Sequence, residues 1–123
     1  MQWQRTLGGI SGAMSVGTGA YASHGLKKSK ESEAYAKVFE TGSRYQLIHS
    51  VMLAATPAIC KSGGGNHIIA SKVAGACFAS GIALFSGSCY AVGLTEDRSN
   101  GKLAPIGGFA LIGGWLSLAL LRR

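Results

Sequence analysis

The chain is short, basic and rich in glycine: of its 123 residues 47% are hydrophobic, 14% are charged and 19 are glycine, and its formal net charge is +7. Disordered chains are poor in apolar residues, collagen repeats glycine at every third position, and about a quarter of an average soluble domain is charged. The composition excludes the first two classes and disfavours the third. It predicts a single integral membrane domain over residues 1–123.

Four runs without Asp, Glu, Lys or Arg divide the chain, at residues 6–26, 45–60, 73–95 and 103–121. A helix needs about 20 mainly apolar residues to cross a bilayer. The second run is short, but its helix can begin near Thr41, and Lys61 can extend toward the headgroups. We therefore expect an all-α, up-down-up-down bundle of four transmembrane helices, at residues 6–26, 41–61, 73–95 and 103–121.

The connections are polar. The first carries Tyr35, Val38 and Phe39 at helical spacing, which predicts a short interfacial helix over residues 31–42. Residues 62–66 (SGGGN) and 96–102 (EDRSNGK) are expected to be turns. Such threading puts five Lys or Arg residues on one side of the membrane and seven on the other, which does not decide the orientation.

The basic residues lie mostly at the ends of the apolar runs, where anionic lipid headgroups are the natural counter-charges. The sequence carries no basic face and no stacking module of the kind that nucleic-acid-binding proteins use. We therefore expect the lipid bilayer as the main partner, a bound phospholipid as a candidate ligand, and no nucleic acid.

Small residues recur at helical spacing and indicate close helix packing, since lipid tails give helices no hydrophobic reason to associate. The third run has small residues at five positions, each four apart. Whether that ladder faces a sister helix or another protein stays open. The residues expected to pack helices together are Gly8, Gly12, Gly75, Ala79, Ala83, Gly87, Ala91, Gly107 and Gly114.

Polar residues gather near the ends of the runs that antiparallel threading brings to one half of the membrane. Because polar groups in a bilayer need partners, they predict a hydrogen-bonded structural cluster on one rim, with both histidines at one headgroup level. The members of this predicted rim cluster are His24, Tyr45, Gln46, His49, Ser86, Ser88 and Tyr90.

Three other functions would make further demands on these residues or their helices. A haem or metal held by His24 and His49 would need both imidazoles to point inward at similar depth. A serine nucleophile would need an oxyanion motif, which the sequence does not show. A carrier would favour broken helices or charges at mid-membrane. We expect no catalytic residue, no cofactor and no metal.

Four segments resemble those of the transmembrane protein 256 / YgdD family. Residues 19–26 (GAYASHGL) are similar to its GA-x-GAHGL segment, although Ala22 and Ser23 replace the usual Gly-Ala, and residues 39–49 (FETGSRYQLIH) resemble its F-x-T-A/G-x-x-YQ-x-x-H segment. Residues 84–90 (LFSGSCY) resemble its LFSGS-x-Y signature, and residues 105–115 its P-x-GG…GW close. The resemblance implies a four-helix membrane protein of bacterial inner membranes and of eukaryotes, where mitochondria are the expected site. It implies no activity.

We therefore expect a non-catalytic accessory subunit of a larger respiratory-chain complex in the mitochondrial inner membrane. Its partners would be other transmembrane subunits, and a thylakoid or plasma membrane is the alternative location. Two other functions stay open: a small carrier or channel for a solute or lipid, and a membrane protein that binds haem or a metal.

Overall fold

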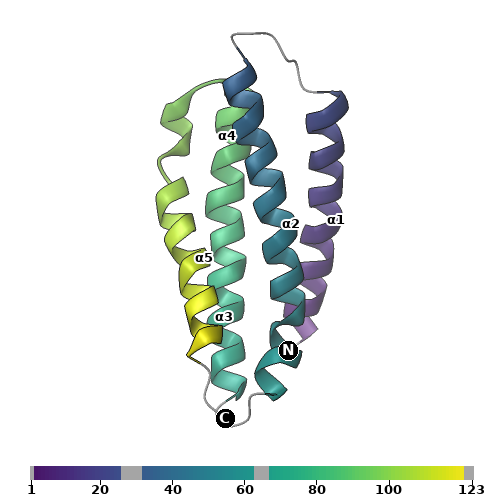
Figure 1. The fold of residues 1–123 in the computed structure, drawn as a ribbon, viewed down its shortest axis with the longest axis vertical. Helices are drawn as coiled ribbons and strands as arrows, with labels where there is room; N and C mark the ends of the chain where they lie inside the picture. Colours follow the sequence, from purple (N-terminus) through teal and green to yellow (C-terminus); the bar gives the residue numbers. More distant parts are fainter. Residues whose placement is uncertain (1, 26–31, 63–66, 121–123) are drawn as a thin grey trace.

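The computed structural model describes residues 2–25, 32–62 and 67–120, all in helices or short turns (Figure 1). The expected turn at residues 62–66 and the ends of the first and fourth expected spans, at residues 26 and 121, lie wholly or partly outside the described residues. The elements in chain order are α1 (Gln2–His24), α2 (Glu33–Ser62), α3 (His67–Gly81), the π-helical turn η1 (Ile82–Ser86), α4 (Gly87–Thr95), the 3-10 turn η2 (Arg98–Gly101) and α5 (Ala104–Ala119).

Four antiparallel rods make up the fold, because α3, η1 and α4 follow one another without a break. In Figure 1, α1 and α5 form the two outer edges, and α2 and the α3–η1–α4 rod lie between them. The main packing partner of α1 is α2, and that of α5 is α3. The expected all-helical class and the expected number of helices agree with this arrangement.

The helix predicted for residues 31–42 is present, in its described part, as the first third of α2, a continuous helix of 30 residues that leads into the second expected span, but its placement on the membrane surface is wrong. Its apolar side is occupied inside the bundle. Phe39 is 3% exposed, and its ring packs against those of Tyr21 and Tyr90. Gly93 lies so close that an added Cβ would come within 2.7 Å of the Phe39 Cβ. This apolar side therefore faces other helices.

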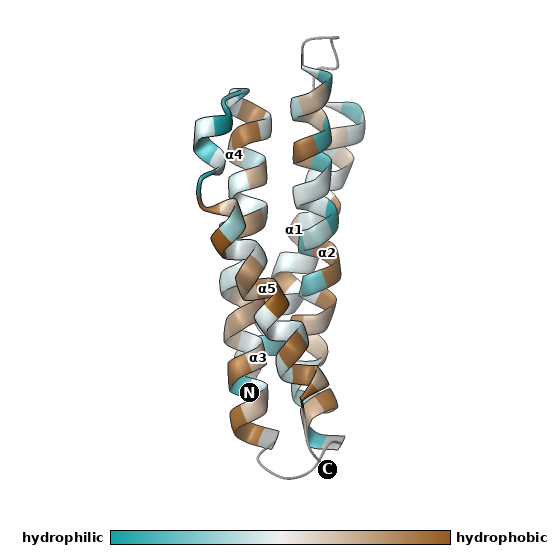
Figure 2. Cartoon of the chain, turned by 60° about the vertical axis from the view of Figure 1, so that its left-hand side comes forward, coloured by the Kyte–Doolittle hydropathy of each residue, from teal (hydrophilic) through white to brown (hydrophobic). Residues whose placement is uncertain are grey.

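The bundle has a small apolar core and an apolar exterior. Its core cluster joins Leu53 of α2, Ala74 and Phe78 of α3, Ile82 of η1 and Leu111 of α5. Serine, threonine, glutamine and histidine side chains are buried beside it, while 22 large hydrophobic side chains of the described residues are exposed. Figure 2 shows that hydrophobic residues are frequent along α3 and α5. A soluble domain rarely leaves so much contiguous apolar surface uncovered.

Two rods are long and apolar enough to cross a membrane by length and composition: residues Ile68–Thr95 and Arg98–Ala119. The helices α1 and α2 carry more polar residues and do not meet the same criterion among the described segments. A four-helix membrane bundle is compatible with the fold.

The predicted polar turn after α4 is present. Glu96 ends α4 in the left-handed conformation, with φ of 54°. The Asp97 carboxylate then accepts hydrogen bonds from the Ser99 backbone N–H, at 2.9 Å, and from Ser99 Oγ, at 2.7 Å. These bonds hold the pKa of Asp97 below its ordinary value. Side-chain capping of this kind starts η2 directly after α4 and turns the chain back toward α5.

Candidate functional site

A hydrogen-bonded polar seam runs between α1, α2 and α4. On α1 the hydroxyl residues recur at steps of four and three, and on α2 the polar residues recur at steps of three and four, so each set shares one helix face. We define the polar seam by these residues: Ser11, Ser15, Thr18, Ser43, Gln46, Ser50 and Tyr90.

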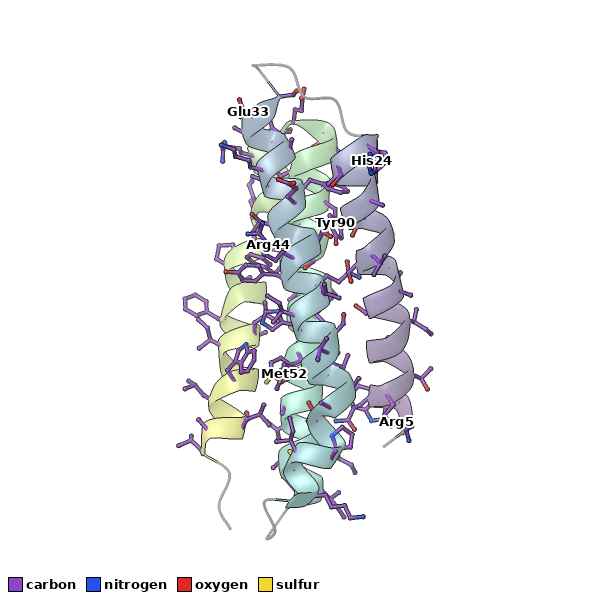
Figure 3. The ribbon with its side chains drawn as sticks, turned by 45° about the vertical axis from the view of Figure 1, so that its right-hand side comes forward. Arg5, His24, Glu33, Arg44, Met52 and Tyr90 are labelled. Carbon is purple, nitrogen blue, oxygen red and sulfur yellow. The ribbon has the colours of Figure 1, made fainter. Side chains whose placement is uncertain are left out.

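Gln46 is the centre of the seam and is 4% exposed. Its Nε2 donates to the Ser11 carbonyl oxygen at 3.1 Å and to Ser11 Oγ at 3.2 Å. Its Oε1 accepts a hydrogen bond from the Tyr90 hydroxyl, which also lies 3.0 Å from Thr18 Oγ1. One amide therefore joins three helices, and Figure 3 shows Tyr90 between α2 and α1.

His49 forms a second polar contact, between α2 and α5. Its Nε2 accepts a hydrogen bond from Trp115 Nε1 at 3.0 Å, and its Nδ1 lies 2.6 Å from the Tyr45 carbonyl oxygen. Because an indole N–H only donates, Nδ1 must carry the imidazole proton and donate to Tyr45. The rings of Tyr45, Phe78 and Trp115 surround the imidazole. Both ring nitrogens are thus engaged by protein groups, an arrangement that a haem or metal ligand would have to break.

Replacing Trp115 with phenylalanine is expected to lower the stability of the bundle by about 1 kcal/mol, because the ring packing persists but the hydrogen bond to His49 is lost. The measurement is the midpoint of thermal unfolding in detergent. Trp3→Phe, on the exposed side of α1, serves as the matched control. A Trp115→Phe midpoint equal to that of the control would show that the indole N–H adds nothing.

The π-helical turn η1 lies between two glycines of neighbouring helices. On one side, the Ser86 Oγ donates to the Gly42 carbonyl oxygen of α2 at 2.8 Å. On the other, Gly107 of α5 lies so close that an added Cβ would fall 2.8 Å from the Leu84 carbonyl carbon and overlap the backbone nitrogen of Phe85. Single-turn π-helices inside α-helices often occur at functional sites.

The structure brings together part of the predicted rim cluster and disperses the rest. Gln46 and Tyr90 hydrogen-bond to each other. Ser86 donates to the Gly42 carbonyl oxygen, one helical turn before Gln46 on α2, and the ring of Tyr45 packs on that of Phe85. Ser88 is buried but does not join the seam through any hydrogen bond between described residues.

The prediction that both histidines lie at one headgroup level is wrong. His24 is exposed at the end of α1, where Figure 3 places it at the tip of the bundle. His49 lies sixteen residues after Glu33, the first residue of α2, and therefore about 24 Å along that helix at 1.5 Å per residue. The error follows from the start of α2, eight residues before the expected Thr41. His24 consequently takes no part in the polar seam.

The expected packing glycines fall into three groups. An added Cβ would overlap a neighbour at Gly8, Gly75, Gly107 and Gly114, would make an ordinary 3.8 Å contact with the Ser50 Cβ at Gly12, and would meet no described atom of another element within 4 Å at Gly87. The third-helix ladder does not pack against a sister helix along its length. Ala83 and Gly87 are exposed, Ala79 and Ala91 half-buried. Close-packed glycines that the sequence analysis did not single out are Gly42, Gly81 and Gly93.

Within the described ranges there is no group of three or more His, Cys, Asp or Glu side chains that could hold a metal ion. Cys60, Cys77 and Cys89 are free thiols. The seam hydroxyls bond to one another and to backbone carbonyls, so the arrangement supports helix packing.

Comparison with known proteins matches residues 18–108 to the family described as "Protein of unknown function (DUF423)". The chain belongs to the DUF423 family. A UPF0382 membrane protein of Staphylococcus haemolyticus is 40% identical over 114 residues, which cover 93% of this chain and 89% of that protein. The UPF0382 membrane protein YwdK of Bacillus subtilis is 33% identical, with coverage of 93% and 90%, and a Haemophilus influenzae relative is 35% identical, with coverage of 93% and 88%. No solved structure matches the chain.

The UPF0382 relatives are named membrane proteins, and this chain, with its apolar exterior, is an integral membrane protein as well. The narrower assignment to the transmembrane protein 256 / YgdD family rests on the sequence motifs alone. These relatives are bacterial, which fits a plasma membrane better than the expected mitochondrial inner membrane. They lend no support to a respiratory-chain role.

Proposed function

We propose that all four helices cross the bilayer and that the protein is a non-catalytic accessory subunit that packs against other transmembrane helices. With 23 and 30 residues, α1 and α2 are about 35 and 45 Å long at 1.5 Å per residue. Both lengths exceed the bilayer core of about 30 Å. The seam residues of the two helices face each other, while Ile10, Met14, Ile48 and Val51 are exposed. This division suits helices surrounded by lipid.

A second small-residue face on α1 carries the accessory proposal. Gly8 packs tightly on Ala54 of α2, but Gly9, Ala13 and Gly17 lie at four-residue steps on an exposed face. An added Cβ at Gly9 or Gly17 would meet no atom of another described element within 4 Å. A shallow hollow of about 460 Å³ lies beside this face, between α1 and α2. Small exposed faces let transmembrane helices approach closely.

The accessory role predicts a larger complex that depends on this face. The double variant Gly9→Leu, Gly17→Leu is expected to lose the complex in native gels of mild-detergent extracts while keeping its own melting midpoint, because the new side chains enter open space. Ala58→Leu, at an exposed position of α2 outside the hollow, is the matched control. A wild-type chain that migrates alone would contradict the accessory role.

Topology tests the four spans separately. A reporter domain inserted between α1 and α2 is expected on the side of the membrane opposite to a reporter fused before α1. If only the α3–η1–α4 rod and α5 cross, both reporters will lie on one side. That result would reject the crossing of α1 and α2.

The same mild-detergent extraction can identify the complex to which the protein belongs. A respiratory-chain assembly, expected from the sequence, stays a prediction, and mass spectrometry of the copurifying proteins tests it. The bacterial relatives favour a plasma membrane over a mitochondrial or thylakoid membrane as the place to look. A second candidate function, a carrier for lipid, draws support from an apolar groove of about 350 Å³ between α1 and the α3–η1–α4 rod.

A further inference from the structure

An apolar groove of about 350 Å³ lies between α1 and the α3–η1–α4 rod, with α2 behind it. The α1 helix contributes Ile10 and Met14 to the walls, and the third rod contributes Ala79, Ala83 and Gly87. Three of the five regularly spaced small residues of the third run, Ala79, Ala83 and Gly87, therefore form the floor of this groove. The volume lies within the range of small-molecule sites, about 300–1,000 Å³.

The shape of the groove selects a thin, extended occupant. On the third rod it runs from Ala79 to Tyr90, eleven residues further on, which is about 16 Å at 1.5 Å per residue. Its volume of about 350 Å³ is drawn out over that length, so the groove is long and thin. An extended chain of methylene groups fits along it, with α1 on one side and the third rod on the other.

The chemistry of the walls selects a hydrocarbon. No Asp, Glu, Lys, Arg or His side chain is among the described residues that line the groove. The four polar residues that do line it already have protein partners. Gln46 and Ser11 bond to each other, the Tyr90 hydroxyl donates to Gln46, and Ser86 donates to a backbone carbonyl. A polar solute would lose its water there without gaining a charged partner, which costs free energy, whereas an alkyl chain has no hydrogen bonds to water to lose.

The π-helical turn shapes the groove floor. Ile82, Ala83 and Ser86 of η1 line the groove, and Gly87 follows directly. A Cβ added at Gly87 would meet no described atom of another element within 4 Å, so the space above it is open.

We propose that this groove is a binding site for one acyl chain of a membrane phospholipid, which lies along the helix axes against Ala83 and Gly87. The site rests on the proposed four spans, because α1 must cross the bilayer for its groove face to meet acyl chains. The rim residues Ile10 and Met14, 56% and 57% exposed, then close over the chain from the lipid side.

Photolabelling tests the site. The protein is placed in phosphatidylethanolamine–phosphatidylglycerol nanodiscs that contain a phospholipid with a diazirine in the middle of one acyl chain, and labelled residues are mapped by mass spectrometry. We expect labelling at Met14 and Ala83 above the level at the outward-facing residues Leu47 and Phe109. Gly87→Leu, which fills the open floor, is expected to reduce labelling at Met14 to that background. Ala76→Leu, exposed on the same rod but outside the groove, should leave it unchanged.

Two results would overturn the site. One is labelling of Met14 no stronger than that of Leu47 and equal in wild type and Gly87→Leu, which is what surface lipid alone would give. The other is cross-linking of the groove residues to a second protein. If Gly87→Leu lowers the melting midpoint, Ala83→Leu replaces it as the filling variant.

Labelling of Val16, which is 66% exposed on α1 and lies outside the groove, tests whether α1 crosses the bilayer independently of the groove site. Labelling at Val16 without specific labelling at Met14 rejects only the groove site. Absence of label at Val16, together with label on α5, rejects the crossing of α1.

Discussion

Replacing Gly107 with alanine is expected to destabilise the bundle by about 2 kcal/mol. The new methyl group would overlap the backbone nitrogen of Phe85 and lie 2.8 Å from the Leu84 carbonyl carbon. Backbone atoms cannot rotate aside, so α5 must move away from η1, and overpacking of this kind costs about 3 kcal/mol at the upper end of its usual range. The higher helix propensity of alanine offsets about 1 kcal/mol.

The neighbouring glycine provides the control. A Cβ at Gly108 would meet only the Phe85 side chain, at 3.9 Å, which is an ordinary contact. Gly108→Ala should therefore keep or raise the midpoint of thermal unfolding in detergent, while Gly107→Ala lowers it. Midpoints that shift in the same direction by the same amount would mean that α5 does not rest on η1 through Gly107.

The helices were predictable because a chain that crosses a membrane must leave long stretches without charge. The start of α2 was not. Tyr35, Val38 and Phe39 have the same helical spacing whether their apolar side rests on a membrane surface or on other helices. In the structure Phe39 contacts Tyr21, Tyr90 and Gly93, so this side rests on other helices, and α2 begins at Glu33. Because α2 begins eight residues earlier than expected, His49 lies about two helical turns further from the start of its helix than predicted, and so further from His24.

The polar seam could have been found more completely from spacing. Ser11, Ser15 and Thr18 share one face of α1, and Ser43, Gln46 and Ser50 share one face of α2. Polar residues at helical steps in two apolar segments indicate facing surfaces, because each needs a partner in the bilayer. Depth along the helices alone predicts that Gln46 and Tyr90 lie together, but it does not predict the hydroxyl partners on α1.

Two features cannot be predicted from helical spacing. One is the hydrogen bond between Trp115 and His49, and the other is the π-helical turn η1. Both depend on where α5 crosses its neighbours. Gly107 lets α5 rest directly on the backbone of η1, and Trp115, eight residues further along α5, then lies beside His49. Crossing points of helices far apart in sequence leave no local periodicity, and a glycine that packs tightly looks the same in sequence as one that faces lipid.

Replacing Phe78 with alanine is expected to cost about 3 kcal/mol, the largest loss from a single truncation in the core. Phe78 is fully buried in the apolar cluster, where its ring contacts those of His49 and Trp115 and lies against Gly114. Truncation of a buried phenylalanine in a soluble protein costs about 3–5 kcal/mol, a sum of lost transfer free energy and the cavity left behind. In a bilayer the ring faces lipid when the helices separate. The contribution from transfer free energy is therefore smaller than in water, while the cost of the cavity and of the lost packing contacts remains.

Phe109→Ala is the matched control, because Phe109 lies on α5 and is 72% exposed. If its ring faces lipid in the folded bundle and in separated helices alike, its removal should leave the unfolding midpoint in detergent unchanged. A loss at Phe109 as large as that at Phe78 would place Phe109 in a protein contact, and equal small effects at both would mean that the α2–α3–α5 core does not hold the bundle together. The difference between the two truncations therefore measures how much of the stability comes from packing inside the helices' shared core.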